Sequence, residues 1–329
     1  MRARLLLPLL ISLLLCGCGE GEYTYDLFAM NTVISLRFTA DDQTEADTIA
    51  RSCEALIADI EQQTSRTIET SDVSRFNASE SGIPLGEHSR AIVETALEIS
   101  SLTDGAYDIT VAPLVELWDV ISETPCIPET AEITAALARV GYEQLTLDGD
   151  ILNKSAPSCA IDLGSIAKGY ALGKTAELLS ASGVKRAVIS FGGNVALVGE
   201  KEDGSLWKIG IKNPLSPAEA AGYLHIDGGC VSVSGDYERY FELDGRRYHH
   251  IISPKEGYPT SNGIHSAAVY CEDAMLGDAL STAIFVGGIE MCEKLYAAES
   301  IHFEALIFTD DGVYMTDGMN KLYEEENHA

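Results

Sequence analysis

The sequence predicts an α+β fold, a single compact domain in which mixed or antiparallel sheets are flanked by helices. Nearly every segment between residues 186 and 270 is strand-like, whereas the helical patterns stand before and after this region instead of alternating with single strands. No internal repeat and no linker rich in Pro, Gly or Ser divides the 329 residues, which are enough to bury a sizeable core.

The first half of the chain is expected to open with a strand and then to become helical. Residues 23–39 contain the alternating segment TVISLRF, which predicts a strand. Residues 43–62 have helical periodicity after an acidic start, and further helical signals lie near 88–103 and 130–140. The polar stretch 64–82 is expected to be a long ordered loop.

The second half is expected to supply most of the sheets. Two short strands flank Asp-Gly-Asp at 148–150, which is a hairpin signal, and residues 161–183 have the pattern of a loop that enters a helix. Strand-like segments then follow one another closely: RAVISFGG, NVALVG, WKIGI, GYLHID, CVSVSG, RYFEL, RYHHII and SAAVY. Helices at 274–286 and 289–298 and a final hairpin at 303–316 complete the expected order.

The N-terminus has the features of a secretory signal. Two arginines precede a leucine-rich run that is short for a membrane-spanning helix. The following LCGC resembles the bacterial lipobox, so we expect residues 1–17 to be removed as a lipoprotein signal peptide and Cys18 to be lipidated, with 18–27 as a tether. Cys16 fits less well, because leucine would then occupy the cleavage-adjacent site, and plain secretion is the alternative. The domain should therefore be lipid-anchored to the cell membrane, facing the periplasm or the cell exterior.

The charge of the chain limits its partners. Lys and Arg number 22 against 51 Asp and Glu, a formal net charge of −29, which predicts no nucleic-acid partner because binding nucleic acid requires a basic surface. An anionic ligand would need a cation or backbone N–H groups to be held.

Six cysteines follow Cys18 without a CxxC pair or zinc-site spacing, which leaves disulfides and buried free thiols both open.

An acid and a hydroxyl stand inside the apolar segment LGDALSTAIFVG at 276–287. On a helix, Asp278 and Thr282 are four residues apart and share one face. A carboxylate removed from water is costly unless a positive group meets it, and the nearest basic residues along the chain are Lys255 and Lys294. Either a distant residue pairs with Asp278 or a cation does.

Two further polar stretches precede the strand-rich region. Residues 103–120 have the pattern of a turn, Asp104-Gly105, before a buried strand. In residues 161–174, Gly164 and Gly169 allow close backbone approach where a helix begins, and exposed N–H groups there could receive a phosphate. The segment matches neither the P-loop pattern nor GxGxxG, and an ordinary glycine-containing cap is the alternative.

Two more polar stretches lie inside the strand-rich region. In residues 190–199, Gly192-Gly193-Asn194 predicts a tight hairpin turn. Residues 232–259 gather polar and aromatic side chains on short strands, where His249 and His250 should point to opposite faces. One of them is a general-base candidate, although a structural histidine is commoner. Taken together, the polar stretches indicate an anionic ligand held by a metal and glycine-rich backbone.

Eight motifs in order carry a family resemblance. They are FAMNT, SDVSRFN, GAYDITVAPLVELW, IDLGSIAKGYALG, GGNVALVG, SGDYERYF, HHIISPKEGYP and GDALSTA, and they lie in a stretch from about residue 28 to 318, which leaves 319–329 as a C-terminal tail. In this the chain resembles the ApbE family of FAD:protein FMN transferases. The resemblance implies an enzyme that cleaves the FAD pyrophosphate with Mg²⁺, transfers FMN to a Thr or Ser hydroxyl of an exported flavoprotein, such as a membrane electron-transfer subunit, and releases AMP.

The resemblance also implies which residues form the site. Asp278 and Thr282 fall at the magnesium ligands, with a third oxygen near Ser165, and oxygen ligands completed by substrate phosphates suit Mg²⁺. Asp278 and His250 would be catalytic, His250 by assisting the acceptor hydroxyl, which is a poor nucleophile without a base. The residues implied to line the FAD site are Met30, Thr67, Ala106, Tyr107, Asp108, Asp162, Lys168 and Ile252.

Three positions depart from the family pattern. Ser253 stands where the segment usually carries aspartate, and Lys168 stands where some members have an acidic residue. Thr67 falls where others have tyrosine or asparagine, which leaves open the balance between transfer to a protein and hydrolysis. The alternatives are therefore a Mg²⁺-dependent FAD pyrophosphatase giving FMN and AMP, and a carrier lipoprotein that binds FAD. The strand-rich second half and the Asp278/Thr282 pair both favour an enzyme over a carrier.

Overall fold

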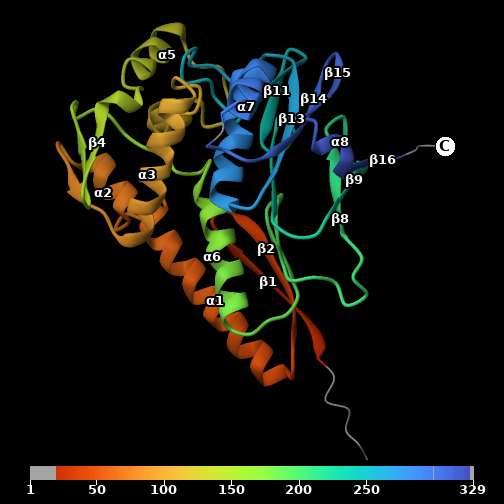
Figure 1. The fold of residues 1–329 in the computed structure, drawn as a ribbon. Helices are drawn as coiled ribbons and strands as arrows, with labels where there is room; N and C mark the ends of the chain where they lie inside the picture. Colours follow the sequence, from red (N-terminus) through yellow and green to blue (C-terminus); the bar gives the residue numbers. More distant parts are fainter. Residues whose placement is uncertain (1–19, 299, 327–329) are drawn as a thin grey trace, which may run out of the picture.

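A large antiparallel sheet organises the molecule (Figure 1). The computed structural model describes residues 20–298 and 300–326. Each neighbouring pair in the sheet is antiparallel, so of the two sheet types expected it is the antiparallel one that forms. Across the sheet the strands follow the order β1 (Gly21–Ala29), β2 (Thr32–Ala40), β6 (Ala187–Phe191), β7 (Asn194–Val198), β10 (Cys230–Gly235), β13 (Ile264–Cys271), β14 (Glu304–Thr309) and β15 (Gly312–Met315).

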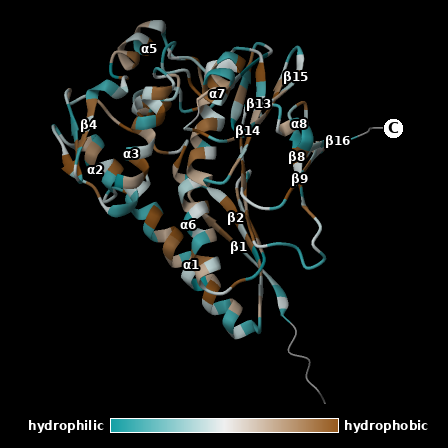
Figure 2. Cartoon of the chain, in the orientation of Figure 1, coloured by the Kyte–Doolittle hydropathy of each residue, from teal (hydrophilic) through white to brown (hydrophobic). Residues whose placement is uncertain are grey.

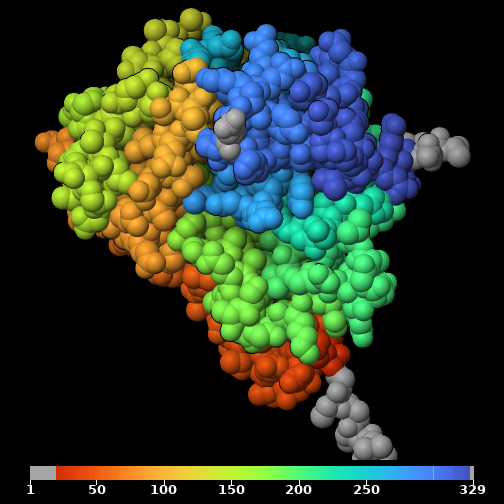
Figure 3. Space-filling model, viewed as in Figure 1, coloured from red at the N-terminus to blue at the C-terminus, as the bar shows by residue number. Residues whose placement is uncertain are grey.

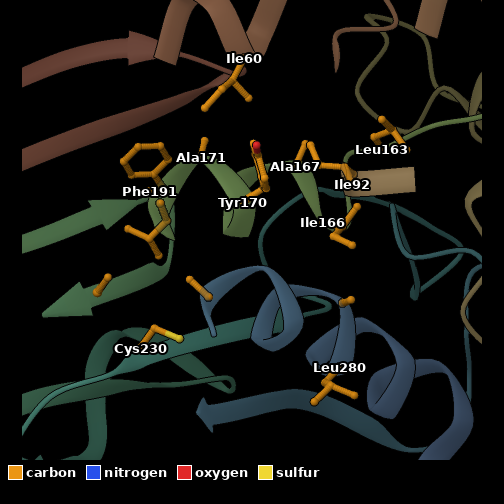
Figure 4. Close-up of a cluster of buried hydrophobic side chains, with 14 of the residues drawn as sticks. Ile60, Ile92, Leu163, Ile166, Ala167, Tyr170, Ala171, Phe191, Cys230 and Leu280 are labelled. Carbon is orange, nitrogen blue, oxygen red and sulfur yellow. The ribbon is translucent and has the colours of Figure 1, made fainter. Parts of the chain in front are cut away.

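Three helices pack on one face of this sheet: α1 (Gln43–Thr64), α6 (Ala167–Ala181) and α7 (Ala274–Tyr296). The Asp42 side chain begins α1 by accepting the N–H groups of Thr44 and Glu45. Brown and teal turns alternate along α1, as expected of an amphipathic helix (Figure 2). In the core, Tyr170 and Ala171 of α6 lie between Ile60 of α1 and Leu280 of α7 (Figure 4).

α7 joins the two helices expected at 274–286 and 289–298. Gly288 interrupts it with φ +82° and ψ −176°, a conformation that glycine adopts readily. Among the described residues α7 is also the one helix that is long and apolar enough to cross a membrane. It packs on β10, β13 and α6, so its apolar residues belong to the core.

A small sheet covers part of the opposite face. Its strands, in order, are β16 (Tyr323–Glu325), β9 (Ser216–Ile226) and β8 (Trp207–Asn213), and an apolar cluster joins them to the large sheet. α8 (Met319–Leu322) precedes β16 and buries Met319. Residues 319–325, within the segment expected to be a C-terminal tail, therefore add a helix and a strand to the fold.

The remaining elements lie around these layers. The hairpin signal at 148–150 is confirmed by β4 (Leu145–Asp148) and β5 (Ile151–Lys154), and a second hairpin follows β10. The elements not yet given are β3 (Ile83–Pro84), β11 (Tyr240–Leu243), β12 (Arg246–His249), α2 (Asp72–Ala78), α3 (Glu87–Leu102), α4 (Ala112–Trp118), α5 (Thr130–Leu137) and the 3-10 turns η1 (Ile109–Val111) and η2 (Tyr142–Gln144).

Two local predictions were wrong. Residues 64–82 are not a loop throughout, because the Ser71 hydroxyl caps α2 and that helix buries Val73 and Phe76. Residues 103–120 do turn at Asp104-Gly105, where both φ angles are positive, but helical turns η1 and α4 follow in place of a strand. A short apolar run has no periodicity that separates strand from helix, and the Asp108 cap of η1 decides for the helix.

The predicted signal peptide and Cys18 lie outside the described residues. The first strand, β1, begins at Gly21, inside the predicted tether.

The six cysteines after Cys18 are free thiols, of which Cys126 is exposed and the others are buried. Burial raises the pKa of the Cys53 thiol to about 11 and that of Cys292 to about 12, which makes both unreactive at neutral pH.

Candidate active site

α6 and α7 touch at Gly169, in the first turn of α6. A Cβ added at Gly169 would lie 2.2 Å from the carbonyl oxygen of Ala274 and 2.5 Å from Cβ of Asp278. Real side chains do not approach backbone so closely, so only glycine allows this crossing. The close approach brings the N-terminal turn of α6, whose N–H groups lack partners within the helix, against the Asp278 side chain.

Three distant groups surround the Asp278 carboxylate, which is 4% exposed. The Gly169 N–H donates to Oδ2 at 2.8 Å, and the Asn194 side-chain amide donates to Oδ1 at 2.9 Å. Lys168 Nζ lies 3.8 Å from Oδ2, beyond hydrogen-bond distance. The positive end of the α6 dipole and the ammonium group of Lys168 thus offset the charge that the sequence left unexplained.

The oxygen atoms around Asp278 fit Mg²⁺. An ionised carboxylate has about four acceptor positions, and N–H donors occupy two of them here. One turn along the same face, the Thr282 hydroxyl lies 3.1 Å from the Ser234 hydroxyl. Mg²⁺ commonly takes one or two carboxylates and completes its shell with waters and substrate phosphates. The described residues contain no cluster of three His, Cys, Asp or Glu side chains, and such a site does not require one.

Tyr107 connects Ser165 to this group. The Ser165 hydroxyl donates to the Tyr107 hydroxyl at 3.2 Å, and Ser165 stands four residues before Gly169. Burial, with a smaller contribution from the Asp278 charge, raises the pKa of Tyr107, which therefore stays protonated. Asp108 and Asp162 contribute in the same direction, so Tyr107 stands within the field of three carboxylates.

His250 follows β12 and is held by the backbone of Arg239. The His250 N–H donates to the Arg239 carbonyl at 3.0 Å, and Nδ1 lies 3.3 Å from the same oxygen. Since a carbonyl only accepts, Nδ1 carries the proton and Nε2 keeps a free lone pair. Burial, followed by the charges of Arg239 and Lys168 and by His249, lowers the pKa of His250 to about 3. The imidazole is therefore neutral at physiological pH.

The turn between β1 and β2 lies beside Arg239. Met30 and Asn31 have φ values of +51° and +57°, as in a two-residue hairpin turn of type I′. The Met30 N–H donates to Glu61 Oε1 at 2.8 Å, and Arg239 donates to the Asn31 carbonyl at 2.8 Å. These two contacts hold Met30 in a backbone conformation with positive φ, which residues other than glycine and asparagine rarely adopt.

Arg66, the residue before Thr67, pairs with Asp162. The Arg66 Nε lies 3.0 Å from Asp162 Oδ2, and the Gly164 N–H donates to Asp162 Oδ1 at 2.7 Å. Thr67 is exposed, and its hydroxyl lies 3.0 Å from the Ser65 hydroxyl. Arg66 therefore adds a third cation to this end of the molecule, after Lys168 and Arg239.

The other predicted FAD-site residues are buried in the framework. Asp108 caps η1, because Oδ1 accepts the Thr110 N–H and hydroxyl and Oδ2 accepts the Tyr142 N–H. Burial raises the pKa of this carboxyl group. Ala106 is 5% exposed, and Ile252 packs in an apolar cluster with Trp118. A role in contacting FAD stays a prediction for these three residues.

The structure thus brings together Asp278 and Lys168, and it joins Ser165 to Tyr107 by a hydrogen bond. His250 is held by Arg239, and the charge of Lys168 contributes to lowering its pKa.

Four residues without a predicted role each hold a different predicted site residue: Asn194 bonds Asp278, Arg66 pairs with Asp162, Arg239 accepts from His250 and Glu61 accepts from Met30. The segment 190–199 was interpreted as a plain turn, and that turn is present, with positive φ at both glycines. The polarity of Asn194 directly after it was the one available signal, and its long-range partner Asp278 was not visible in the sequence.

Oxygen ligands, cations and a neutral imidazole suit chemistry on a phosphate ester or anhydride. The oxygens can hold a hard dication, the cations can attract phosphate, and the imidazole can accept a proton from a hydroxyl. The one buried carboxylate of this group has a single cation, Lys168, beside it and accepts two N–H groups, so an anionic ligand meets less repulsion there than elsewhere on this acidic protein.

Comparison with protein-family models matches residues 30–307 to the ApbE family. Among characterised sequences, the FAD:protein FMN transferase of Vibrio cholerae serotype O1 is 32% identical over 308 residues, which cover 91% of this chain and 92% of the relative. The FAD:protein FMN transferase of Escherichia coli K12 is 35% identical over 69% of this chain and 67% of its own length.

Solved structures agree with this match. The flavin transferase ApbE from Vibrio cholerae has a TM-score of 0.82 at 28% identity, over 92% of this chain and all of that one. The ApbE protein from Thermotoga maritima has a TM-score of 0.83 at 32% identity, over 93% of this chain and 100% of its own. The apo form of the Pseudomonas stutzeri flavinyl transferase ApbE has a TM-score of 0.81 at 30% identity, over 94% and 98% of the two chains.

Proposed function

The chain belongs to the ApbE family, and we propose from this premise how it acts as an FAD:protein FMN transferase. The reaction depends on Mg²⁺ held at Asp278 and Thr282, with Ser165 nearby. It cleaves the FAD pyrophosphate, joins FMN to a Thr or Ser hydroxyl of an exported flavoprotein, and releases AMP. The observation that carries this assignment is the buried Asp278 carboxylate, which lies at the N-terminus of α6 beside Lys168. The charge of Lys168 also acts on the neutral His250.

The metal supplies charge neutralisation: when bound, Mg²⁺ offsets the negative charge of the pyrophosphate and of the departing AMP. The side chains that would bind the metal offer oxygen atoms as ligands. Gly169 and Asn194 hold the Asp278 carboxylate in one orientation through 2.8 Å and 2.9 Å hydrogen bonds, and each carboxylate oxygen keeps a lone pair free. Loss of either donor should therefore misorient the ligand without removing it.

Lys168 and Arg239 supply the cations that an anionic substrate needs. Lys168 Nζ donates to the Gly164 carbonyl at 2.6 Å and is 3.8 Å from Asp278, so the ammonium stands at the start of α6. Arg239 bonds the β1–β2 turn through the Asn31 carbonyl. The Arg239 carbonyl accepts the backbone N–H of His250, and the charges of Arg239 and Lys168 both lower the pKa of its imidazole.

His250 accepts the proton of the acceptor hydroxyl. Its Nδ1–H points to the Arg239 carbonyl, so Nε2 is the basic nitrogen. As the hydroxyl oxygen bonds to the FMN phosphorus, the bond from that phosphorus to the AMP oxygen breaks, and the proton passes to Nε2. Because burial keeps the imidazole neutral at physiological pH, the Nε2 lone pair is available to accept this proton.

The acceptor is an exported protein if the N-terminus is processed as its sequence predicts. Lipidation of Cys18 would tether the enzyme to the outer face of the cell membrane, where membrane electron-transfer subunits present their flavin sites. Since the first strand begins at Gly21, three residues after Cys18, a lipid on Cys18 would hold the domain close to the membrane surface.

The test combines the protein with FAD, Mg²⁺ and a flavoprotein subunit that carries a candidate threonine. Intact mass of the acceptor and release of AMP are followed together, with a Thr→Val acceptor as control. We expect equal amounts of FMN-labelled acceptor and AMP, both abolished by EDTA. AMP with free FMN and no labelled acceptor would identify a pyrophosphatase, provided that another ApbE transferase labels the same acceptor. Bound, intact FAD would identify a carrier.

A further inference from the structure

Two buried cysteines stand directly opposite each other in the large sheet. Cys230 begins β10 and Cys271 ends β13, and the antiparallel register pairs the two residues. Their Sγ atoms are 3.8 Å apart, and the residues are 1% and 4% exposed. The other four cysteines that the structure describes lie outside strands: Cys53 is on α1, Cys292 is on α7, and Cys126 and Cys159 are in connecting segments.

The backbone of this pair has dimensions that suit a disulfide. Opposite residues of antiparallel strands have Cα atoms about 4.5–5.5 Å apart, and disulfides join Cα atoms that are about 4.4–6.8 Å apart. The two sulfur atoms must approach from 3.8 Å to about 2.05 Å, which rotation of the side chains can achieve without moving a strand. Each thiol now donates to a backbone carbonyl, and because a thiol is a weak donor, losing these bonds costs little.

The first turns of α7 cover the pair. A Cβ added at Gly277 would lie 3.0 Å from Cys271 Sγ, so the missing side chain lets the helix pack on this sulfur. Figure 4 shows Cys230 beside α7, and in Figure 3 blue residues of the last third of the chain lie directly against teal and green residues of the strand-rich segment. A reagent in solution therefore has little access to the pair in the folded protein.

Oxidation of the pair must precede this packing. The hydrogen bond with Cys230, together with burial, raises the pKa of the Cys271 thiol in the folded protein, where the thiolate that reacts is therefore scarce. In the unfolded chain both thiols are exposed and have ordinary pKa values. The predicted signal peptide would deliver the unfolded chain to a compartment outside the cytoplasm, where disulfides form and persist.

We propose that Cys230 and Cys271 form a disulfide as the exported chain folds. The oxidant is itself a disulfide, that of a thiol oxidase or of a small thiol. One cysteine thiolate attacks a sulfur of the oxidant and releases the other as a thiolate, and the second cysteine thiolate then displaces the first sulfur from the mixed disulfide. Two electrons pass to the oxidant, and its two released sulfurs take up the two protons that the cysteines lose.

The cross-link fastens the beginning of α7 to the sheet beside the active site. Cys271 stands two residues before Asp273, which caps α7, and β10 carries Ser234, whose hydroxyl lies 3.1 Å from that of Thr282. The two cysteines are 41 positions apart, and a loop of that length restricts the unfolded chain enough to shift the unfolding equilibrium by about a hundredfold. The timing rests on the predicted export, whereas the geometry of the pair depends on neither export nor the transfer chemistry.

Peptide mapping tests the proposal directly. The full chain is exported in a bacterial host that forms disulfides in its periplasm, purified in neutral detergent without reductant, and unfolded in urea with N-ethylmaleimide. In molecules whose signal peptide has been cleaved, we expect the peptides of Cys230 and Cys271 to be linked and lighter by two hydrogens, and Cys53 to carry the label. The reduced chain, refolded from urea with oxidised and reduced glutathione, should give the same link.

Thermal unfolding with and without reductant gives a second readout. The midpoint of the wild type should fall by at least about 3 °C in dithiothreitol, because the unfolded chain is no longer cross-linked. Cys230→Ala and Cys271→Ala should each have one midpoint in both conditions, whatever cost in stability the lost side chain brings. Cys126→Ser, which removes the exposed thiol, is the matched control and should respond to dithiothreitol as the wild type does.

Three results would overturn the proposal. They are labelled thiols at both positions in the cleaved or the refolded chain, a link from either cysteine to another one, and a wild-type midpoint that dithiothreitol leaves unchanged. The link is read by mass and needs no FMN transfer, so its absence and a failure of the proposed function are separate outcomes.

Discussion

Asp278 is stabilised where it lies because the molecule provides several weak partners in place of one strong salt bridge. A backbone N–H, an amide and a lysine at 3.8 Å each contribute, and each comes from a different part of the chain. Such an arrangement leaves acceptor positions on the carboxylate open. A direct salt bridge would occupy those acceptor positions. Several weaker contacts to Asp278 leave them available to a ligand.

Gly169 gives the first prediction at this scale. Gly169→Ala places a methyl group 2.2 Å from the Ala274 carbonyl, so α6 and α7 must separate. We expect a loss of about 1–3 kcal/mol in the free energy of unfolding and a fall in AMP release of at least tenfold. The control is Gly173→Ala on the same helix, where the new Cβ meets only Ala274 Cβ at 3.6 Å. Equal behaviour of the two variants would contradict the close crossing.

His250 gives the second prediction, which concerns pH. Its pKa is about 3 in the folded state against 6.5 for an unperturbed histidine, so between these values the unfolded chain binds a proton that the folded protein does not. Stability therefore falls as pH drops below about 6.5, by up to about 1.4 kcal/mol per pH unit. His250→Gln should lose this part of the slope. Urea unfolding of both proteins from about pH 7.5 to pH 5 measures it, and identical slopes would show that His250 titrates normally.

For single residues, the sequence predicted which side chains could carry the chemistry, but it did not predict which residues contact them. It singled out Asp278 because an acid inside an apolar helix is unusual in any fold. It could not find Asn194 or Lys168 as neighbours of Asp278, because the contacts span 84 and 110 positions and depend on the crossing at Gly169. Asp108 also has a structural role that the sequence did not indicate, since its carboxylate caps a helical turn, and its contact with FAD stays a prediction.

Among the elements, α4 matters to the active site although it contributes no catalytic group. Trp118 ends this helix and donates its indole N–H to the Gly257 carbonyl at 2.8 Å. It also stacks on Tyr248, with ring centres 5.8 Å apart. His250 lies between Tyr248 and the turn at Gly257 along the chain, so α4 holds the segment that carries the base.

Trp118→Phe tests this role of α4. The variant keeps an aromatic ring and loses the hydrogen bond, which should lower the free energy of unfolding by about 1–3 kcal/mol because a buried carbonyl loses its donor. We also expect a lower kcat with little change in the KM for FAD. Trp207→Phe is the matched control: its indole N–H bonds the Gly199 carbonyl near the surface, where water can replace it, so the change should stay within about 0.5 kcal/mol. Similar losses in both variants would contradict the argument.

Elements were predictable wherever their pattern was long. The helix at 43–62, the strands between 186 and 270 and the break between the two parts of α7 were all confirmed. α2 and α4, at seven residues each, were missed because a short helix presents too few turns for periodicity to appear. Ser71, which caps α2, and Asp108, which caps the turn η1 before α4, were visible in the sequence, but such residues are also common in turns.

For the whole molecule, the fold class followed from the order of segments, whereas the pairing of strands did not. β2 pairs with β6, and about 150 residues separate these strands along the chain, so no local pattern indicates the pairing.

The strong negative charge is likewise a property of the whole chain. It leaves the few cations near the active site as the local exception on which an anionic substrate depends.

Anchoring is the prediction that belongs to this scale. Cys18→Ser should move the protein from the membrane fraction to the soluble fraction and abolish incorporation of labelled fatty acid. Transfer activity in solution should stay within about twofold of the wild type, because the first strand begins at Gly21 and the active site lies elsewhere. Cys16→Ser is the control and should remain lipidated. Membrane attachment that needs Cys16 and not Cys18 would contradict the lipobox assignment.

The central claim is that the Asp278 cluster is the centre of Mg²⁺-dependent transfer, and one measurement tests it most directly. FMN transfer to the acceptor is measured in a single turnover, over a range of Mg²⁺ concentrations, for the wild type, Asp278→Asn and Asp273→Asn. Asp273 caps the same helix, and asparagine caps equally well, so this variant controls for the loss of a charge on α7. We predict a loss of at least about a thousandfold for Asp278→Asn in a folded protein that still binds FAD, and near wild-type transfer for Asp273→Asn. Transfer by Asp278→Asn at the wild-type rate and with the wild-type Mg²⁺ dependence would contradict the account.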